Sequence, residues 1–246
     1  MIKRVLKGEQ RQQLTEDLYR KYSKTSGMSN WLIFVRKKYS WLIIIGCAKV
    51  IKRGLDIALA GLALLLLSPL LLVIALGIYL TDGRPILYVA NRVGKWGEEF
   101  RFPKFRSMYV GADKQQAALQ KFDDLQDTKR FKAKTDPRIT RLGRFLRRTS
   151  LDELPQLWCV FKGDMSLIGP RPPLPKEVEL YSVEERRRLD VTPGLTCFWQ
   201  VGGRSEISFE HQVALDVQYI ESQSFWGDCL LLLRTIPAII LGKGAY

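Results

Sequence analysis

The chain has 246 residues, of which 46% are hydrophobic, and 39 Lys and Arg against 25 Asp and Glu give a formal net charge of +14. That length allows one domain or two small ones, and the charge indicates an anionic partner: an acidic lipid, a phosphorylated substrate or a nucleic acid. The four cysteines are scattered without a CxxC pair, which argues against a zinc site or a disulfide framework. The single histidine, His211, lies in no setting typical of a His-activated serine or cysteine nucleophile.

Residues 1–30 are mostly polar and charged and carry no motif with recognisable chemistry. From Trp31 to Val50, short apolar runs alternate with basic residues. Tryptophan and basic side chains of this kind favour a segment lying along the lipid headgroups, although a surface helix packed on the rest of the protein explains the pattern equally well. We expect residues 1–50 to form a polar and interfacial N-terminal extension.

The chain is organised around Ile57–Leu80, a run of 24 residues without a charge. As one helix it would extend about 36 Å, enough to cross a bilayer core of roughly 30 Å. Ser68 and Pro69 lie at its centre, and a proline there has no N–H for the Leu65 carbonyl, which predicts a kink or a break. Each half is then about 18 Å long, too short to span alone. The Ser68 hydroxyl is available for the carbonyl that loses its donor.

Basic residues flank this run on both sides. They are Lys49, Lys52 and Arg53 before it and Arg84, Arg92, Lys95, Arg101, Lys104 and Arg106 after it. Because an excess of Lys and Arg marks the cytoplasmic side, residues 51–82 are predicted to enter and leave one leaflet as a re-entrant helix–break–helix. A kinked span remains the alternative, since prolines are tolerated in spanning helices. Basic flanks beside a membrane indicate anionic lipids rather than nucleic acid as the partner.

A β-hairpin is predicted after the apolar run. Ile86–Arg92 and Glu99–Lys104 have the composition and alternation of strands, and a glycine-containing loop separates them. Lys104 and Arg106 follow at its end, on either side of an aromatic residue. Two such cations can clamp a phosphate, although alone they are more often a solvated edge.

A helix is predicted to begin at Asp136-Pro137, with arginines at every third position on one face. These are Arg138, Arg141, Arg144 and Arg147. The face is either simply solvated or a surface for phosphates and lipid headgroups, because guanidinium groups bind phosphate oxygens bidentately. The pattern leaves both interpretations open.

Two adjacent carboxylates, Asp152 and Glu153, follow this helix. Ser150 and Glu153 have the spacing of a capping box, so the pair could simply complement a helix N-terminus. Alternatively, one carboxylate is a nucleophile, since it is ionised at neutral pH and no serine or cysteine competes. Adjacent helical residues point roughly 100° apart, which suits one carboxylate at a reacting centre and the other on a metal or water. Attack on phosphorus would need cations on the phosphate oxygens and favours Mg²⁺.

Six motifs occur in order along the chain. They are KRGLDIALAG with a following SP at 52–69, KFRSM at 104–108, RRTSLDELPQLW at 147–158, FKGDMSLIGPRPP at 161–173, TPGLTCFWQVGGRS at 192–205 and LDVQYI at 215–220. Together they resemble the bacterial sugar transferases, the monotopic polyprenyl-phosphate phosphoglycosyl transferases, from about Lys52 to Tyr246. Larger members carry four spanning helices and an extra domain upstream, and the resemblance leaves residues 1–50 unassigned. Pro155 stands where many members have a better helix former, so the turn after the carboxylates departs from the pattern.

The resemblance implies a two-step reaction. An aspartate attacks the β-phosphate of a nucleotide sugar, and undecaprenyl phosphate then takes up the sugar phosphate, as the first membrane step of exopolysaccharide or glycoconjugate synthesis. Asp152 would be the nucleophile and Glu153 a Mg²⁺ ligand, with both carboxylates near the metal. The basic residues expected at the phosphates and the nucleotide sugar are Lys104, Arg106, Arg147, Arg171 and Arg204. UDP-glucose or UDP-galactose is the expected donor, and the cytoplasmic face of a bacterial inner membrane the expected location.

We therefore expect an α+β, mostly helical monotopic membrane protein with a small β-hairpin and interfacial amphipathic helices. Residues 83–246 would form the cytoplasmic catalytic domain, with helices at Ser208–Ile220 and Phe225–Leu241. Two other hypotheses remain: a non-catalytic basic membrane adaptor, and a one-step transferase without a covalent intermediate. The sequence does not identify the sugar and does not decide between a monomer and a homodimer.

Overall fold

A computed structural model describes residues 16–17, 28–112, 136–202 and 207–241. The chain divides into two units, Met1–Gly54 and Leu55–Tyr246. One long helix, α2 (Met28–Asp82), runs through the boundary between them. Among the described residues, one helical stretch, Trp31–Asp82, is long and apolar enough to cross a membrane by length and composition.

The first unit is described chiefly by the N-terminal part of α2. The stretch predicted as interfacial is helical there, and its large apolar side chains are exposed, among them Trp31, Ile43 and Val50. Most of residues 1–30 lie outside the described part of the chain. The division into an extension, a membrane segment and a catalytic domain stays a prediction.

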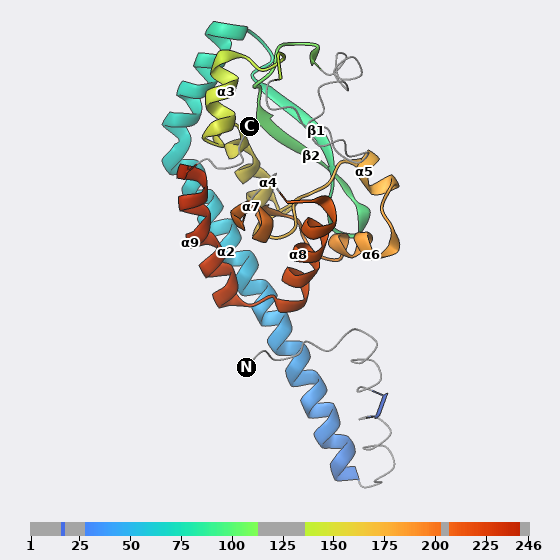
Figure 1. The fold of residues 1–246 in the computed structure, drawn as a ribbon. Coiled ribbons are helices and arrows are strands. Elements are labelled where there is room, and N and C mark those ends of the chain that lie inside the picture. The colour runs from blue at the N-terminus through green and yellow to red at the C-terminus, as the bar shows by residue number, and fades with distance from the viewer. Residues whose placement is uncertain (1–15, 18–27, 113–135, 203–206, 242–246) are drawn as a thin grey trace. The chain divides into compact units, whose positions relative to one another are not determined.

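The sequence predicted a kink or a break at Ser68-Pro69, and the break is wrong. The helix α2 continues without interruption through Pro69. The Ser68 Oγ donates a hydrogen bond of 2.8 Å to the Leu65 carbonyl, the group that Pro69 cannot serve, so the helix loses no partner at this point. In Figure 1 the ribbon of α2 instead changes direction between its light-blue and its teal part, within the second unit.

Within the second unit, α2 packs one face on the domain and exposes the other. Ala60, Ile74 and Ile78 are buried, whereas Leu65 and Leu72 are about 70% exposed. This stripe of buried residues at helical spacing is the pattern of an amphipathic packing face, even though both faces are apolar. The outer face of α2 therefore presents a continuous apolar surface.

Both ends of this stretch of α2 are bound to the same domain. At one end, Asp56 Oδ1 accepts a hydrogen bond of 3.0 Å from the Leu167 N–H. At the other end, Arg106 Nη2 donates to the carbonyls of Asp82 and Gly83 at 2.6 and 2.9 Å. Arg106 thus satisfies carbonyls that every helix C-terminus leaves without an intrahelical partner.

The predicted β-hairpin is present. Strand β1 (Leu87–Val93) pairs antiparallel with β2 (Glu99–Phe105), and the short helix η1 (Lys95–Gly97) joins them. Ala90 pairs with Phe102 in this register. Because side chains alternate between the two faces of a strand, Arg92, Phe102 and Lys104 lie on one face of the hairpin.

The remaining elements are short helices and one further pair of strands. They are α3 (Arg141–Arg148), η4 (Leu151–Gln156), α4 (Leu157–Lys162), β3 (Ser166–Ile168), α5 (Pro175–Glu179), α6 (Val183–Arg186), η5 (Arg187–Asp190), β4 (Gly194–Thr196), α7 (Phe198–Gly202), α8 (Phe209–Ser222) and α9 (Phe225–Leu241). The mostly helical prediction is confirmed, and so are the helices at α8 and α9. The parallel pairing of β3 with β4 was not predicted, because three-residue strands leave no periodic signal.

Two apolar clusters hold the domain on α2. The larger one unites Ala60 of α2 with Phe102, Val160, Tyr219 and Leu231, from β2, α4, α8 and α9. The smaller one unites Ile74 and Ile78 with Phe105 of β2 and Leu146 of α3. The end of β2 and the region of α3 and η4 are therefore fixed against α2, and Figure 1 shows the hairpin and these short helices gathered along it.

Candidate active site

Three segments far apart in the sequence meet at Glu153. Its Oε1 accepts from Lys104 Nζ of β2 at 2.6 Å and from Arg171 Nη2, in the turn after β3, at 2.7 Å. The structure thus brings together three of the side chains that the sequence singled out. A carboxylate bound by two cations in this way is a charge-assisted network, with stronger hydrogen bonds than neutral groups form.

The predicted capping box is wrong. Ser150 adopts a left-handed backbone conformation (φ 57°) and makes no side-chain cap hydrogen bond. The following turn is the 3₁₀ helix η4, with Pro155 inside it, rather than the start of an α-helix. Since a 3₁₀ helix has three residues per turn, Asp152 and Glu153 point about 120° apart. Glu153 can therefore face the two cations while Asp152 takes a different direction.

The charge state of Glu153 is set by its two partners. Burial by itself would raise the pKa of this carboxyl, but Arg171 and Lys104 outweigh it and hold the pKa well below its usual range. Arg171 in turn has its pKa raised, because Glu153 outweighs the effect of burial. Burial lowers the pKa of Lys104, and Glu153 opposes that shift. The two cations thus favour the ionised form of Glu153, which suits an anchor for them rather than a proton donor.

Asp152 has the opposite tendency. It is 7% exposed, and burial raises its pKa; Lys104 opposes this shift, and the neighbouring Glu153 charge adds to it. The Arg147 and Arg171 charges also lower this pKa, so both lie close enough to act on it. A buried carboxylate with a raised pKa is a better base and nucleophile than one in water.

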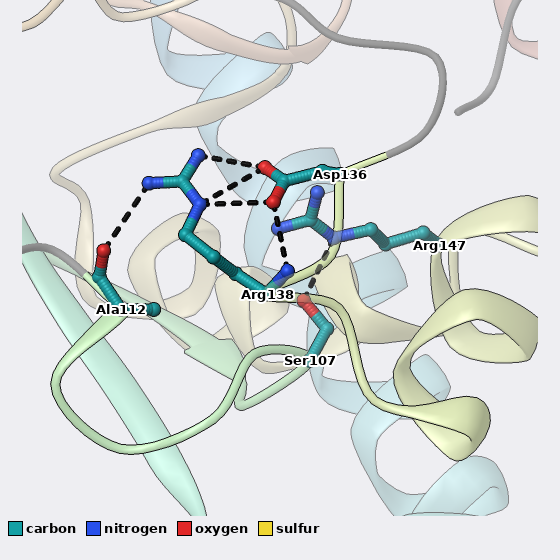
Figure 2. Close-up of polar contacts among 5 residues, drawn as sticks. All are labelled: Ser107, Ala112, Asp136, Arg138 and Arg147. Atoms are coloured by element: carbon teal, nitrogen blue, oxygen red, sulfur yellow. Dashed lines mark hydrogen bonds and ion pairs between the residues drawn. The ribbon is translucent and has the colours of Figure 1, made fainter. Parts of the chain in front are cut away.

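Arg147 lies next to a buried ion pair, as Figure 2 shows. Its Nε donates to Ser107 Oγ at 2.8 Å. A Cβ at Gly143 would overlap the backbone of Ser107, so this glycine lets α3 approach the end of β2 and brings Arg147 to that hydroxyl. Burial lowers the pKa of Arg147, and the charges of Asp152 and Asp136 oppose the shift.

The predicted arginine face does not form as such. The helix α3 begins at Arg141, so Arg138 lies before it, buried, with Nε and Nη2 on the Asp136 carboxylate at 2.9 and 2.6 Å and Nη1 on the Ala112 carbonyl (Figure 2). Asp136, which the sequence analysis placed at the start of a helix, is the buried ion-pair partner of this arginine. Arg141 and Arg144 are exposed on α3. The regular spacing therefore conceals two different environments.

Two other predicted residues stand apart from this cluster. Arg106 is buried, and its guanidinium faces the end of α2, which points to a structural role there. Arg204 lies outside the described residues. A residue that the sequence did not suggest as part of the site, Arg92, lies beside Arg171 instead, because its Nη1 donates to the carbonyl of the next residue, Pro172, at 3.0 Å. Alternation along the hairpin could have found it, since Arg92 and Lys104 share a face.

The carboxylates can be tested as a Mg²⁺ site. Within the described ranges, no group of three or more His, Cys, Asp or Glu side chains is placed to hold a metal. Mg²⁺ in phosphate-transferring sites commonly takes one or two carboxylates together with substrate phosphates and water. Asp152 and Glu153 fit that smaller donor set, with Glu153 offering the oxygen that the two cations leave over.

A pair of carboxylates among three cations suits the binding of phosphates, and the long apolar helix has the length and composition of a membrane segment. The comparisons make the class specific. The chain belongs to the bacterial sugar transferase family, whose model matches residues 47–242.

Three relatives illustrate the similarity. The chain is 44% identical over 209 residues to galactosyl transferase CpsE of Streptococcus agalactiae, covering 85% of this chain and 44% of CpsE. It is 39% identical over 203 residues to the exopolysaccharide production protein ExoY of Rhizobium meliloti, covering 79% and 88%. It is also 39% identical over 204 residues to the UDP-glucose:undecaprenyl-phosphate glucose-1-phosphate transferase of Caulobacter vibrioides, covering 79% and 72%. The chain thus spans less than half of CpsE but most of ExoY.

Proposed function

We propose that this protein transfers a sugar-1-phosphate from a UDP-sugar to undecaprenyl phosphate through a covalent intermediate on Asp152. The observation that carries the proposal is the fixed Glu153, which binds Lys104 and Arg171 and leaves Asp152 buried within reach of the same positive charge. The relatives' names support the substrates, since one is a UDP-glucose:undecaprenyl-phosphate glucose-1-phosphate transferase and another an undecaprenyl-phosphate galactose phosphotransferase.

In the first step, an Asp152 carboxylate oxygen attacks the β-phosphorus of the UDP-sugar. The bond from this phosphorus to the oxygen bridging the two phosphates breaks, and UMP leaves with the electron pair. The positive charges of Lys104, Arg147 and Arg171 stabilise the charge on the phosphoryl oxygens. Because a phosphate is the leaving group, this step needs no general acid.

In the second step, a phosphate oxygen of undecaprenyl phosphate attacks the phosphorus on Asp152. The bond between the aspartyl oxygen and phosphorus breaks, which restores the carboxylate and leaves a lipid-linked diphosphate sugar. Glu153 stays ionised throughout and keeps Lys104 and Arg171 in place. A Mg²⁺ held by Asp152, Glu153 and the diphosphate would supply further positive charge at the phosphate oxygens.

We also propose that the apolar part of α2 is re-entrant, on the cytoplasmic side of the inner membrane. The support is that Asp56 and Arg106 tie both ends of this stretch to one domain, while the apolar face between them is exposed. A spanning helix would separate its two ends by the whole bilayer. The test is cysteine labelling at Leu55 and Arg84 in a background without native cysteines. An impermeant reagent should label both in inverted vesicles, and labelling from opposite sides would contradict the arrangement.

The reaction is tested by UMP release from UDP-glucose and UDP-galactose, with and without undecaprenyl phosphate. A two-step enzyme should exchange labelled UMP into the UDP-sugar without the lipid, and quenched samples should contain a phosphosugar on Asp152. Exchange that requires the lipid would favour a one-step transferase. Binding to anionic vesicles without any UMP release would favour the adaptor hypothesis.

A further inference from the structure

Arg92 and Lys104 share one buried aromatic ring. The Arg92 guanidinium carbon lies 5.3 Å and the Lys104 Nζ 5.5 Å from the centre of the Phe102 ring, which is 1% exposed. Cations over an aromatic face are attracted by its negative charge distribution, more strongly when water is excluded. Phe102 thus lies within cation–π distance of the charged groups of both side chains, on the face of the hairpin that carries the site.

The end of β1 binds the chain directly after Arg171. Arg92 Nη1 donates to the Pro172 carbonyl at 3.0 Å, and the Val93 N–H donates to the Pro173 carbonyl at 2.9 Å. One of these bonds uses a side chain and the other the backbone. The prolines have no N–H of their own to offer, so this stretch is held through its carbonyls.

The chain before Arg171 is held from another side. The Gly169 N–H donates to the Thr196 carbonyl at 3.1 Å, and the Gly194 N–H donates to the Pro170 carbonyl at 2.8 Å. Arg171 therefore lies between two anchors: strand β4 before it and the end of β1 after it. Two hydrogen bonds hold the chain after Arg171. The Arg92 bond comes from a side chain, so a side-chain substitution removes it, whereas the Val93 bond comes from the backbone.

The charge of Arg92 acts in the same direction. Burial lowers the pKa of Arg92 to about 10, and the neighbouring charge of Arg171 adds to this shift. Two guanidinium groups so close repel each other, whereas Glu153 attracts Arg171. Arg92 therefore disfavours positions of the Arg171 side chain that turn back toward the hairpin.

We infer that Arg92 is a positioning residue for the transfer reaction. It binds the Pro172 carbonyl and so holds Arg171 on Glu153, without touching the substrate. This inference rests on the proposed function, because Arg171 matters to catalysis only if phosphates bind there. Its consequence is that Arg92 affects the chemical step through Arg171 alone.

The test compares Arg92→Met and Arg92→Lys with a matched control, Arg101→Met. Arg101 lies on the opposite face of the same hairpin and is exposed. Since displacement of a catalytic group by about 1 Å can cost roughly 100-fold in rate, Arg92→Met should lower kcat for UMP release about 10- to 100-fold with little change in KM. Arg92→Lys, which retains a donor and a charge, should restore part of kcat, and Arg101→Met should match the wild type.

A double-mutant cycle separates positioning through Arg171 from loss of folded protein. Arg92→Met should add little to the loss caused by Arg171→Met. Additive losses, or a raised KM with normal kcat, would overturn the inference.

A measurement without catalysis keeps the two proposals distinguishable. Hydrogen exchange in the peptide covering 166–179 should be faster in Arg92→Met than in the wild type and in Arg101→Met. If the wild type releases no UMP, the proposed function fails, whereas this exchange still reports on the docking. Equal exchange in all three proteins would overturn the docking role itself.

Discussion

Among the described residues of the second unit, two clusters of cations and carboxylates differ in their balance of charge. At the candidate active site, Lys104, Arg147 and Arg171 surround Asp152 and Glu153, so positive charge is in excess even before Arg92 is counted. The side chains of Lys104, Glu153 and Arg171 keep 21%, 22% and 24% of their surface exposed. This cluster is thus open to a substrate and carries the charge to bind an anion.

The second cluster is balanced and closed. Arg188 of η5 and Asp216 of α8 form an ion pair of 2.7 Å, with side chains only 5% and 1% exposed. Arg188 also donates to Tyr181 Oη at 3.0 Å and lies 5.7 Å from the centre of the Phe209 ring. Burial raises the pKa of Asp216 to about 6, although Arg188 opposes the shift.

The difference teaches which features of an ion pair indicate function. Both clusters join segments distant in the sequence, so connection alone does not distinguish them. Excess charge and exposure do, because a phosphate needs an unneutralised cation that it can reach. We therefore expect substitutions at the first cluster to change activity and those at the second to change stability.

The largest expected effect is that of Asp152→Asn. Without the nucleophile, UMP release should fall by roughly four orders of magnitude, the scale seen when a catalytic residue is removed. Asp190→Asn, at an exposed position, is the control and should retain full activity. An active Asp152→Asn protein, or one that still forms a phosphosugar adduct, would remove the first cluster from the catalytic role.

Arg188→Met should destabilise the protein strongly while leaving the catalytic residues intact. Removing one partner of a buried ion pair costs about 3–5 kcal/mol, because the other charge stays buried alone. The melting temperature in detergent should fall by roughly 10 °C. The double variant with Asp216→Leu should recover most of this loss. An Arg188→Met protein as stable as the wild type would contradict the structural role of this ion pair.

The pH dependence of UMP release should move in opposite directions in two variants. Asp152 must be ionised to attack, so activity is lost as the pH falls through its raised pKa, and the acid limb lies above the usual aspartate value of about 3.9. Lys104→Met removes a charge that lowers this pKa and should move the limb upward. Glu153→Gln removes a charge that raises it and should move the limb downward. Shifts of the same sign in both variants would contradict the assignment of Asp152.

The smallest effect is expected in the apolar helix. Ser68→Ala removes the hydroxyl that serves the Leu65 carbonyl and should cost about 1 kcal/mol. Ser68→Thr retains the hydroxyl and is the control. Melting temperatures in detergent should differ by a few degrees, and equal values for all three proteins would show that the helix at Pro69 needs no such support.

Much of the architecture could be predicted because its signals are local. Alternation over about seven residues predicts the hairpin, since the period of two is a property of the extended backbone. The uncharged run predicts helical structure over Ile57–Leu80 in the same way, although the break predicted at its centre does not occur. Residue chemistry pointed to Asp152 and Glu153 as a carboxylate pair, and the family resemblance implied Lys104, Arg147 and Arg171 beside them; the structure places the five around a single cluster.

The remaining decisions depended on partners distant in the sequence. Glu153 has the spacing of a cap, but its carboxylate binds Lys104, which lies 49 residues away. Arg138 and Arg147 belong to the same three-residue repeat of arginines, but Arg138 forms a buried ion pair with Asp136 and so is not part of the site. Arg92 could be linked to Arg171 only through a contact across 80 residues.

The sequence by itself therefore determined the elements and the charge that the protein carries, because backbone geometry and composition act over a few residues. Only the tertiary structure decided which cations are neutralised by a carboxylate and which remain available to a phosphate. It also decided that Arg106 binds the carbonyls at the end of α2. The physical reason is that the energy of a charged side chain depends on its burial and its nearest partner, and both are set by packing between segments.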